Sequence, residues 1–233
     1  AEADFYEGMA TYDLAAGSST NKKPDPTKFP EVIKLLSDWP SRHGESAPNL
    51  LGFVNYVLGR AYIATGEVEK AEEKYRLLGK AGGNLTAVLA TSIFNSYNDQ
   101  IEALKKEIDS LYSQKQLKEA EQAETNLDSV YKRAVAIGSD YFSGSDSPQY
   151  GISSLTLSYI EALGNWSEVE TFGNKVIKAF EGSKDATTRN KVDQFVRASV
   201  GRAMLEQEKW QQAYDLLSAA EKANPKNYPV KRL

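Results

Sequence analysis

Apolar residues recur three and four positions apart along much of the chain, which is the spacing of one face of an α-helix. The clearest case is residues 50–82, where two such stretches flank the segment Thr65, Gly66 and Glu67. Glycine readily adopts the left-handed conformation that ends many helices, so Gly66 predicts the end of the first helix. Two helices joined by so short a turn fold back on each other, and this segment therefore predicts an antiparallel helix pair.

The second helix of this pair carries Val68 and Ala71, and equivalent residues recur further along the chain. They are Leu117 and Ala120, Trp166 and Val169, and Trp210 and Ala213. The recurrence predicts a series of helix pairs, with boundaries at about residues 49–83, 84–142, 149–182 and 185–225. Residues 226–233 are expected to form a C-terminal tail.

The N-terminal part of the chain follows the pattern less closely. Residues 3–16 carry apolar groups at helical spacing, and a polar, Pro-containing loop follows them. Pro30 fits the first turn of a short helix, and Pro40 is expected to close that helix. Residues 1–48 are therefore expected to form divergent helices and Pro-containing loops outside the main series.

The longest predicted helices lie within residues 84–142. Their apolar positions alternate between steps of three and four residues, which is the spacing of a coiled-coil seam. In the first of these helices the positions are Phe94, Tyr97, Ile101, Leu104, Ile108 and Leu111. The polar run from Gln114 to Gln116 marks the reversal, so the segment predicts one elongated hairpin. We interpret the seam as the core of the hairpin itself and not as a site for a separate coiled-coil partner.

Two segments resemble a known repeat family. Leu58, Gly59 and Tyr62, followed by Ala71 and Tyr75, match the tetratricopeptide (TPR) spacing L-G-x-x-Y…A-x-x-x-F, with Tyr75 in the aromatic position. The last predicted pair has a similar pattern, at Gly201, Met204, Ala213, Leu217, Ala220 and Pro225.

The resemblance implies an all-α, TPR-like right-handed α-solenoid of antiparallel helix pairs, with one elongated central helical hairpin. The first repeat departs from the family at two positions: Asn55 stands in place of an early Trp, and Gly83 in place of the final Pro. In this first pair, the small residues Gly59 and Ala71 are expected to let the two backbones approach closely.

Composition narrows the classes of partner. The 233-residue chain has 28 basic and 32 acidic residues, and its net charge of −4 argues against a nucleic-acid-binding surface. No apolar run reaches the roughly 20 residues that a membrane-spanning helix needs. The absence of cysteine excludes disulfides, thiol catalysis and thiolate metal sites.

The first residues of the chain give an indication of the cellular compartment. The chain begins with Ala1, Glu2, Ala3 and Asp4, without an initiator methionine. Such an end is typical of a mature chain from which a signal peptide has been cleaved, although trimming or cloning also leaves one. We therefore expect a secreted protein, periplasmic or extracellular, with the cytoplasm as the alternative.

The sequence offers little catalytic chemistry. His43 is the only histidine, and it stands in a predicted surface loop without a second His or Cys to share a metal. The chain has no P-loop, no G-x-G-x-x-G and no G-x-S-x-G motif. We therefore expect no enzyme activity, no cofactor and no metal site.

A binding surface is the more natural place for function. In TPR-like proteins the first helix of each pair lines a concave face that grips a peptide or another protein. The resemblance places Phe53, Tyr56, Arg60, Phe195 and Arg202 on that face, with the two arginines at the same repeat position. Two arginines in one groove are suited to a carboxylate or an acidic segment. The leading hypothesis is therefore a protein–protein interaction scaffold.

The alternative hypothesis is self-assembly. Solenoids need polar capping elements at their ends, and the sequence shows no extra solvating helix after the last predicted pair. An apolar N-terminal face and an uncapped C-terminal face could join copies of the chain head to tail into an extracellular filament. The residues expected near that joint are Phe5, Met9, Tyr12, Tyr214 and Leu217.

Overall fold

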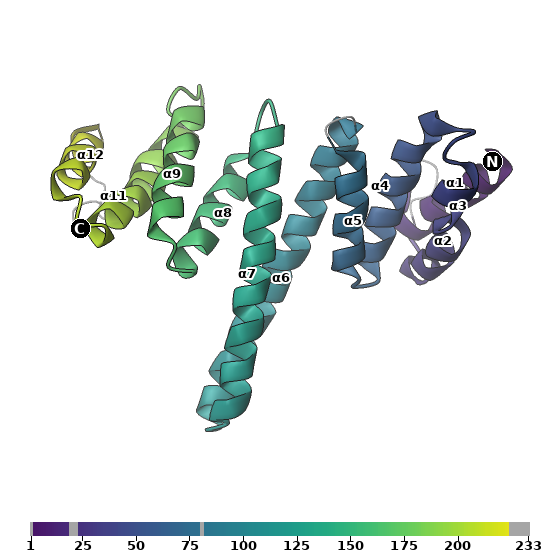
Figure 1. The fold of residues 1–233 in the computed structure, drawn as a ribbon, viewed down its shortest axis with the longest axis horizontal. Coiled ribbons are helices and arrows are strands. Elements are labelled where there is room, and N and C mark those ends of the chain that lie inside the picture. Colours follow the sequence, from purple (N-terminus) through teal and green to yellow (C-terminus); the bar gives the residue numbers. More distant parts are fainter. Residues whose placement is uncertain (1, 19–22, 80–81, 224–233) are drawn as a thin grey trace. The chain divides into compact units, whose positions relative to one another are not determined.

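A computed structural model describes residues 2–18, 23–79 and 82–223, and all regular structure within these ranges is helical (Figure 1). The prediction of an all-α protein is therefore confirmed for the described residues. The chain divides into two compact units, Ala1–Ser96 and Tyr97–Leu233, which are described separately below. The predicted end of the last pair at Pro225 and the predicted tail at 226–233 lie outside the described residues.

Unit 1 is built from short helices packed in antiparallel pairs. Its elements are α1 (Glu2–Ala16), η1 (Pro26–Lys28), α2 (Phe29–Leu36), α3 (Trp39–His43), α4 (Pro48–Ala64), α5 (Val68–Leu78) and the first part of α6 (Asn84–Ser113). Helix α1 packs on α2, α2 on α4, and α4 on α5. The largest buried side chains of this unit include Trp39, Leu36, Leu58 and Leu89, each fully shielded from solvent.

Pro40 begins a helix and does not end one. It occupies the second position of α3. Backbone N–H groups in the first turn of a helix make no hydrogen bond within the helix, so proline, which lacks this group, fits there. Helix α2 has already ended at Leu36. The prediction that Pro40 closes the preceding helix was therefore wrong, although the expected short helix exists.

Gly59 makes a close contact, but not with the helix that the sequence suggested. A Cβ atom at this position would lie 2.6 Å from the Cδ2 atom of Leu89 on α6. The atoms nearest to this position thus belong to α6, while the role of Gly59 in the approach of α4 to α5 stays a prediction. Ala71, the other small residue named for that contact, is completely buried on α5.

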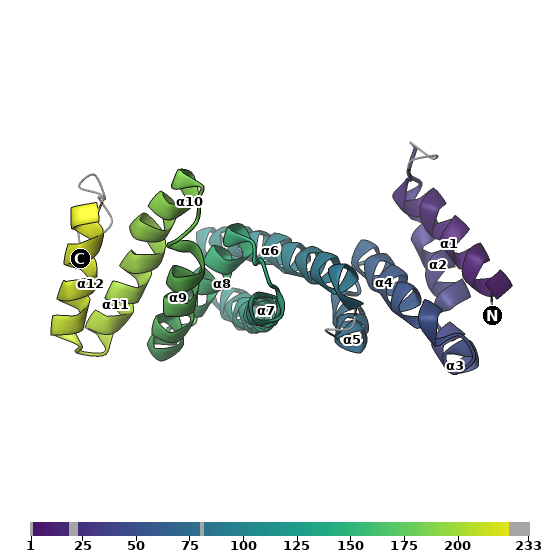
Figure 2. The same cartoon turned by 90° about the horizontal axis from the view of Figure 1, so that it is seen from above.

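Among its described residues, unit 2 contains the long hairpin and four further helical segments. Its elements after α6 are α7 (Leu117–Gly144), α8 (Tyr150–Ala162), α9 (Trp166–Phe180), α10 (Ala186–Lys191), the π-helical turn η3 (Val192–Val196), α11 (Arg197–Glu206) and α12 (Trp210–Ala223). Figure 2 shows α10 running through η3 into α11 as one continuous rod. Helix α7 packs on α8, α8 on α9, α9 on α11, and α11 on α12.

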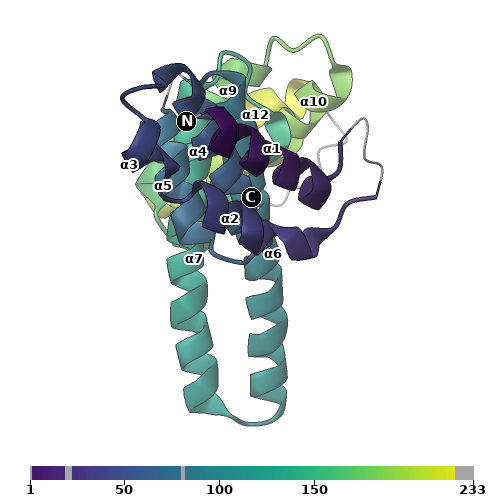
Figure 3. The same cartoon turned by 90° about the vertical axis from the view of Figure 1, so that its right-hand side faces the viewer.

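Helices α6 and α7 form the elongated hairpin that the sequence predicted (Figure 3). The Tyr112 hydroxyl donates to Glu124 near its tip (2.8 Å), and Arg133 donates to the Tyr97 hydroxyl further back (3.4 Å). Burial falls along the hairpin, because Ile101 is fully buried whereas Tyr112 is 45% exposed. Near the turn, apolar side chains are therefore covered mainly by the other helix of the hairpin.

The same turn joins the two helices of four pairs. Each turn contains one residue with positive φ, namely Gly66 (81°), Lys115 (60°), Gly164 (69°) and Glu208 (59°). The N–H of the next residue bonds to the carbonyl five positions earlier, as from Glu67 to Tyr62 at 2.8 Å. This is the Schellman arrangement that closes helix C-termini. The predicted equivalence of Val68, Leu117, Trp166 and Trp210 is confirmed, because each begins the second helix of a pair.

Candidate functional site

A groove lies on unit 2 between α8 and the rod formed by α10, η3 and α11. Its volume is about 290 Å³. Helix α8 contributes Ser154, Leu155 and Ser158 to its walls, and the rod contributes Lys191, Phe195 and Ser199. Both walls belong to first helices of pairs, the helices expected to form a binding face.

The α8 wall combines an apolar side chain with hydroxyl groups. Leu155 is 40% exposed, which is unusual for a leucine beside a packed helix contact. Ser154 donates its hydroxyl proton to the Gly151 carbonyl (3.0 Å), and Ser158 donates to the Ser154 carbonyl (3.1 Å). Both hydroxyl oxygens keep lone pairs, so this wall offers hydrogen-bond acceptors beside an aliphatic surface.

The opposite wall is shaped by the π-helical turn. Asp185 caps α10 by accepting from the N–H groups of Thr187 (3.0 Å) and Thr188 (3.1 Å). The following turn, Val192–Val196, is wider than an α-helical turn, and such turns often occur at functional sites. Within it, Val192 and Val196 are buried, whereas Phe195 between them is 55% exposed at the groove.

Lys191 gives the groove a positive charge. It is exposed and forms no ion pair with any residue that the structure describes. The nearby Arg197 differs, because it pairs with Asp193 (3.0 Å) and Glu181 (3.3 Å). The other lining side chains are neutral at physiological pH, and one of them, Ser199, donates its hydroxyl proton to the Glu161 carboxylate at 2.9 Å.

Tyr150 lies at one end of the groove. Its hydroxyl is buried without a hydrogen-bond partner among the described residues, and burial raises the pKa of Tyr150 to about 12. Its ring packs edge to face on Phe180, with ring centroids 5.5 Å apart. The phenol therefore stays protonated at neutral pH and holds an unused donor.

The predicted binding residues fall into two groups. Phe195 lines the groove, and Arg202 lies further along the same rod. The Arg202 guanidinium is already engaged, because it pairs with Glu161 (3.3 Å) and stands over the Trp166 ring at 5.2 Å from its centroid. Arg202 is thus already paired within unit 2, and its role in binding stays a prediction.

The remaining predicted binding residues lie on α4 of unit 1. Phe53 is 48% exposed, whereas Tyr56 and Arg60 are partly buried. Arg60 donates to the Ser92 hydroxyl on α6 at 3.4 Å. Burial is the main cause that raises the pKa of Tyr12 on α1, and the charge of Arg60 lowers it in part.

The predicted self-association residues differ in their exposure. Phe5 is only 7% exposed and packs against Trp39, with ring centroids 6.3 Å apart. Leu217 is partly buried, and its side chain would lie 2.5 Å from a Cβ atom at Gly201. These two side chains pack against neighbours within their own units, and their place near a joint stays a prediction.

Met9 and Tyr12 are partly buried on α1, and the Tyr12 ring lies 6.2 Å from the Phe29 ring. Tyr214 alone of the five predicted self-association residues is largely exposed, at 68%. Trp210, one turn earlier on α12, is 63% exposed.

Leu155, Ser158 and the π-helical turn were missed by the sequence reasoning. A signal for Ser158 was present, because it stands six residues before Gly164, just as Arg60 stands six residues before Gly66. Transferring that position to the third pair would have placed Ser158 on the binding face. No sequence pattern marked the π-helical turn.

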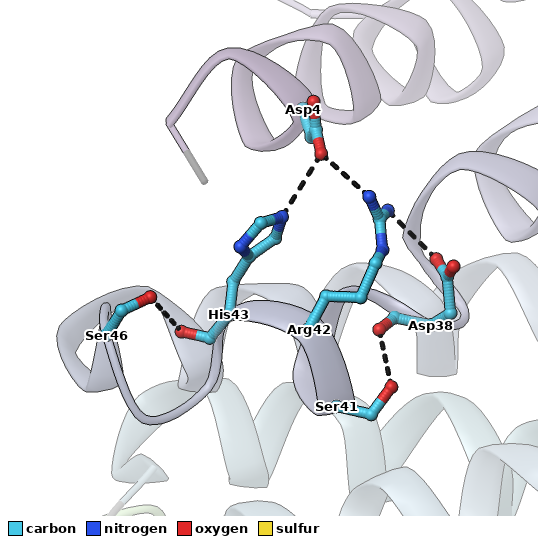
Figure 4. A network of polar contacts seen from close by, with 6 residues as sticks. All are labelled: Asp4, Asp38, Ser41, Arg42, His43 and Ser46. Atoms are coloured by element: carbon cyan, nitrogen blue, oxygen red, sulfur yellow. Dashed lines mark hydrogen bonds and ion pairs between the residues drawn. The ribbon is translucent and has the colours of Figure 1, made fainter.

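His43 takes part in a network that fastens α1 to α3 (Figure 4). Asp4 accepts from the Arg42 guanidinium (3.0 Å) and lies 3.2 Å from Nε2 of His43, while Arg42 also pairs with Asp38 (3.0 Å). The hydrogen bond with His43 is the main cause that lowers the pKa of Asp4. The single histidine therefore has a structural contact, and the described residues contain no group of three potential metal ligands.

The fold and the groove define an all-helical protein of packed antiparallel pairs with an open, apolar and positively charged cleft. Searches of protein-family models, of curated proteins and of solved structures found no match to this chain. Within the part of the chain that the structure describes, no helix has the length and apolar character needed to cross a membrane.

Proposed function

We propose that this protein is a non-enzymatic, TPR-like interaction scaffold acting outside the cytoplasm, and that the groove of unit 2 holds a segment of another protein. The observation that carries this proposal is the pair of exposed apolar side chains, Leu155 and Phe195, which line the groove beside the exposed Lys191. The same turn ends the first helix of four pairs, which supports a repeated helix-pair architecture of the TPR-like kind.

The size and chemistry of the groove favour a peptide over a small-molecule substrate. Drug-sized ligands occupy pockets of roughly 300–1,000 Å³, so a volume of about 290 Å³ suits one or two side chains of a longer segment. An aliphatic or aromatic side chain would pack on Leu155 and Phe195. A carboxylate next to it in the segment would meet the Lys191 ammonium, and its backbone N–H groups would donate to Ser154 and Ser158.

The proposal is tested by selecting peptides from a randomised heptapeptide library displayed on phage, using the full chain as bait. We expect selected sequences to combine a large apolar residue with Asp or Glu. Phe195→Ala should weaken binding of a selected peptide about tenfold or more, because aromatic anchors dominate such contacts. Lys191→Gln should weaken it less and reduce its dependence on salt.

Phe53→Ala is the matched control, because Phe53 is a similarly exposed phenylalanine at the equivalent position of the first pair. Binding that is unaffected by Phe195→Ala, or that falls equally with Phe53→Ala, would contradict the assignment of the groove. Circular dichroism of each variant shows whether the helical fold is retained.

A second proposal is head-to-tail self-assembly into a filament. The exposed Trp210 and Tyr214 on one face of α12 support it, as do Tyr6 (64% exposed) and Leu14 (52%) on α1. Light scattering across a range of concentrations tests it directly. Growth in mass that is lost in Trp210→Ser and Tyr214→Ser would favour the filament, whereas a constant monomer mass would exclude it.

A further inference from the structure

Helix α1 presents an exposed apolar stripe on the surface of unit 1. Tyr6 is 64% exposed, Leu14 is 52% exposed, and Ala10 is exposed between them. The three residues follow one another at steps of four, so they share one face of the helix. The ring of Tyr6 packs edge-on against that of Phe5 (centroids 5.4 Å apart), and Phe5 is buried against Trp39. The Tyr6 ring is therefore anchored at its base and open to solvent.

The charge around this stripe is acidic. Glu2 and Glu7 flank it, both are exposed, and no ion pair that the structure describes involves either of them. Helix α1 contains no Lys or Arg. Apart from the groove walls, the other described helices with exposed large apolar side chains are α4, α5, α6, α7 and α12, and each of these contains Lys or Arg. The surface of α1 thus differs from theirs in combining apolar side chains with negative charge alone.

The groove of unit 2 has the complementary chemistry. Leu155 and Phe195 supply apolar surface from its two walls, and the exposed Lys191 supplies a positive charge beside them. The carboxylate of Glu161 lies nearby, but it is already paired with Arg202 at 3.3 Å. An apolar side chain with an acidic neighbour therefore matches the groove both in packing and in charge.

We propose that the groove of unit 2 binds α1 of a second copy of this chain, an inference that rests on the groove being a binding site. Tyr6 packs between the two apolar walls, and its phenol donates to the hydroxyl oxygen of Ser158. Glu7, the next residue, pairs with Lys191. Each copy carries one α1 and one groove, so the contact joins copies head to tail. It differs from a joint through α12, because it leaves the exposed aromatic side chains of that helix uncovered.

The contact is tested by mixing two variants of the full chain, each lacking one half of it. Tyr6→Ser with Leu14→Ser removes the α1 half, and Lys191→Glu with Phe195→Ala removes the groove half. In light scattering we expect the mass of the wild type to grow with concentration and each variant alone to stay a monomer. The mixture should form a heterodimer and grow no further, because only one intact α1 then meets one intact groove. Formation of this heterodimer also requires that both variants are folded.

Single substitutions test the central side chain. Tyr6→Ser should weaken self-association about tenfold or more, because exposed aromatic residues that become buried dominate such contacts. Tyr6→Phe should weaken it about fivefold through the loss of one hydrogen bond. Tyr214→Ser is the matched control, because Tyr214 is a similarly exposed tyrosine (68%) on α12, and it should leave the association unchanged.

The proposal is overturned if the wild type stays monomeric at every concentration, or if it associates while the mixture of variants does not. It is also overturned if Tyr214→Ser weakens the association as much as Tyr6→Ser. In each of these cases, a phage-selected peptide whose binding depends on Phe195 would leave the groove proposal standing. Loss of that peptide binding as well would remove both proposals together.

Discussion

Adding a methyl group at Gly59 should destabilise the protein, whereas adding one at Gly52 of the same helix should stabilise it. A Cβ atom at position 59 would lie 2.6 and 2.9 Å from the two Cδ atoms of Leu89 and 3.3 Å from its Cγ. Carbon atoms prefer separations of about 3.5–4.0 Å, so Leu89 must shift by about 1 Å. At position 52 the nearest atom is Cδ2 of Leu78 at 4.0 Å, an ordinary contact.

The expected change in the free energy of unfolding for Gly59→Ala is the difference between a gain in helix propensity and a cost of overpacking. Replacing glycine by alanine inside a helix gains about 1 kcal/mol. Overpacking a core costs about 1–3 kcal/mol, and the upper half of this range applies because Leu89 is fully buried and has no solvent to move into. We therefore expect Gly59→Ala to lower the free energy of unfolding by about 1–2 kcal/mol and Gly52→Ala to raise it by up to about 1 kcal/mol.

Urea unfolding followed by tryptophan fluorescence measures this change in unit 1 alone. Trp39 lies in unit 1, while Trp166 and Trp210 lie in unit 2, so a background with both of the latter replaced by Phe isolates the signal. Leu89→Val should cost less in the Gly59→Ala background than in the wild type, because the two changes relieve the same contact. A Gly59→Ala variant as stable as Gly52→Ala would refute the close approach of α4 and α6.

Further predictions concern the turns and the titratable groups. Lys115→Gly should raise the melting temperature, because a left-handed non-glycine residue costs about 1 kcal/mol, and Gly66→Ala should lower it. The lowered pKa of Asp4 means that its stabilisation is present at neutral pH and is lost as the pH falls below about 4, so Asp4→Asn should flatten the melting temperature over that acid range. Tyr150→Phe should remove one tyrosine that ionises near pH 12 in an ultraviolet absorbance titration, without lowering the melting temperature, because the lost hydroxyl has no partner among the described residues.

The helix pairs were readable from the sequence because their determinants are local. Gly66 and Gly164 occupy the left-handed turn position, where glycine has little steric cost, and both were identified as turns. Lys115 and Glu208 adopt the same conformation, but no residue type marks them. They were located only because the apolar pattern restarts two residues later, which shows that periodicity carried more information than turn chemistry.

The groove was only partly readable, because it depends on contacts between helices far apart in the sequence. Phe195 was found by transferring the position of Phe53 from the first pair. Leu155 was not found, since an apolar residue on a helix gives no sign of whether a neighbouring helix covers it. On α1, similarly, Phe5 is buried whereas the adjacent Tyr6 is 64% exposed, and spacing alone did not separate the two.

Arg60 and Arg202 show that a repeat position fixes where a side chain lies but not what it can bind. Both stand six residues before the turn residue of their pair, yet Arg202 meets Glu161 on α8, whereas Arg60 meets Ser92 on α6. The residue on the neighbouring first helix therefore decides whether the arginine is satisfied by the chain. Replacing Ser92 by glutamate and Glu161 by serine should therefore give Arg60 a carboxylate partner and remove that of Arg202.

Ser92→Glu should place a carboxylate beside Arg60, and the resulting ion pair should shift the NMR signal of the Arg60 Nε–Hε group. Glu161→Ser should release Arg202 from its main partner, leaving only the longer 4.0 Å contact with Glu206, and should shift the corresponding Arg202 signal. Circular dichroism establishes that both variants retain their helices. If Ser92→Glu leaves the Arg60 signal unchanged, the residue on the neighbouring helix does not decide whether this arginine is paired.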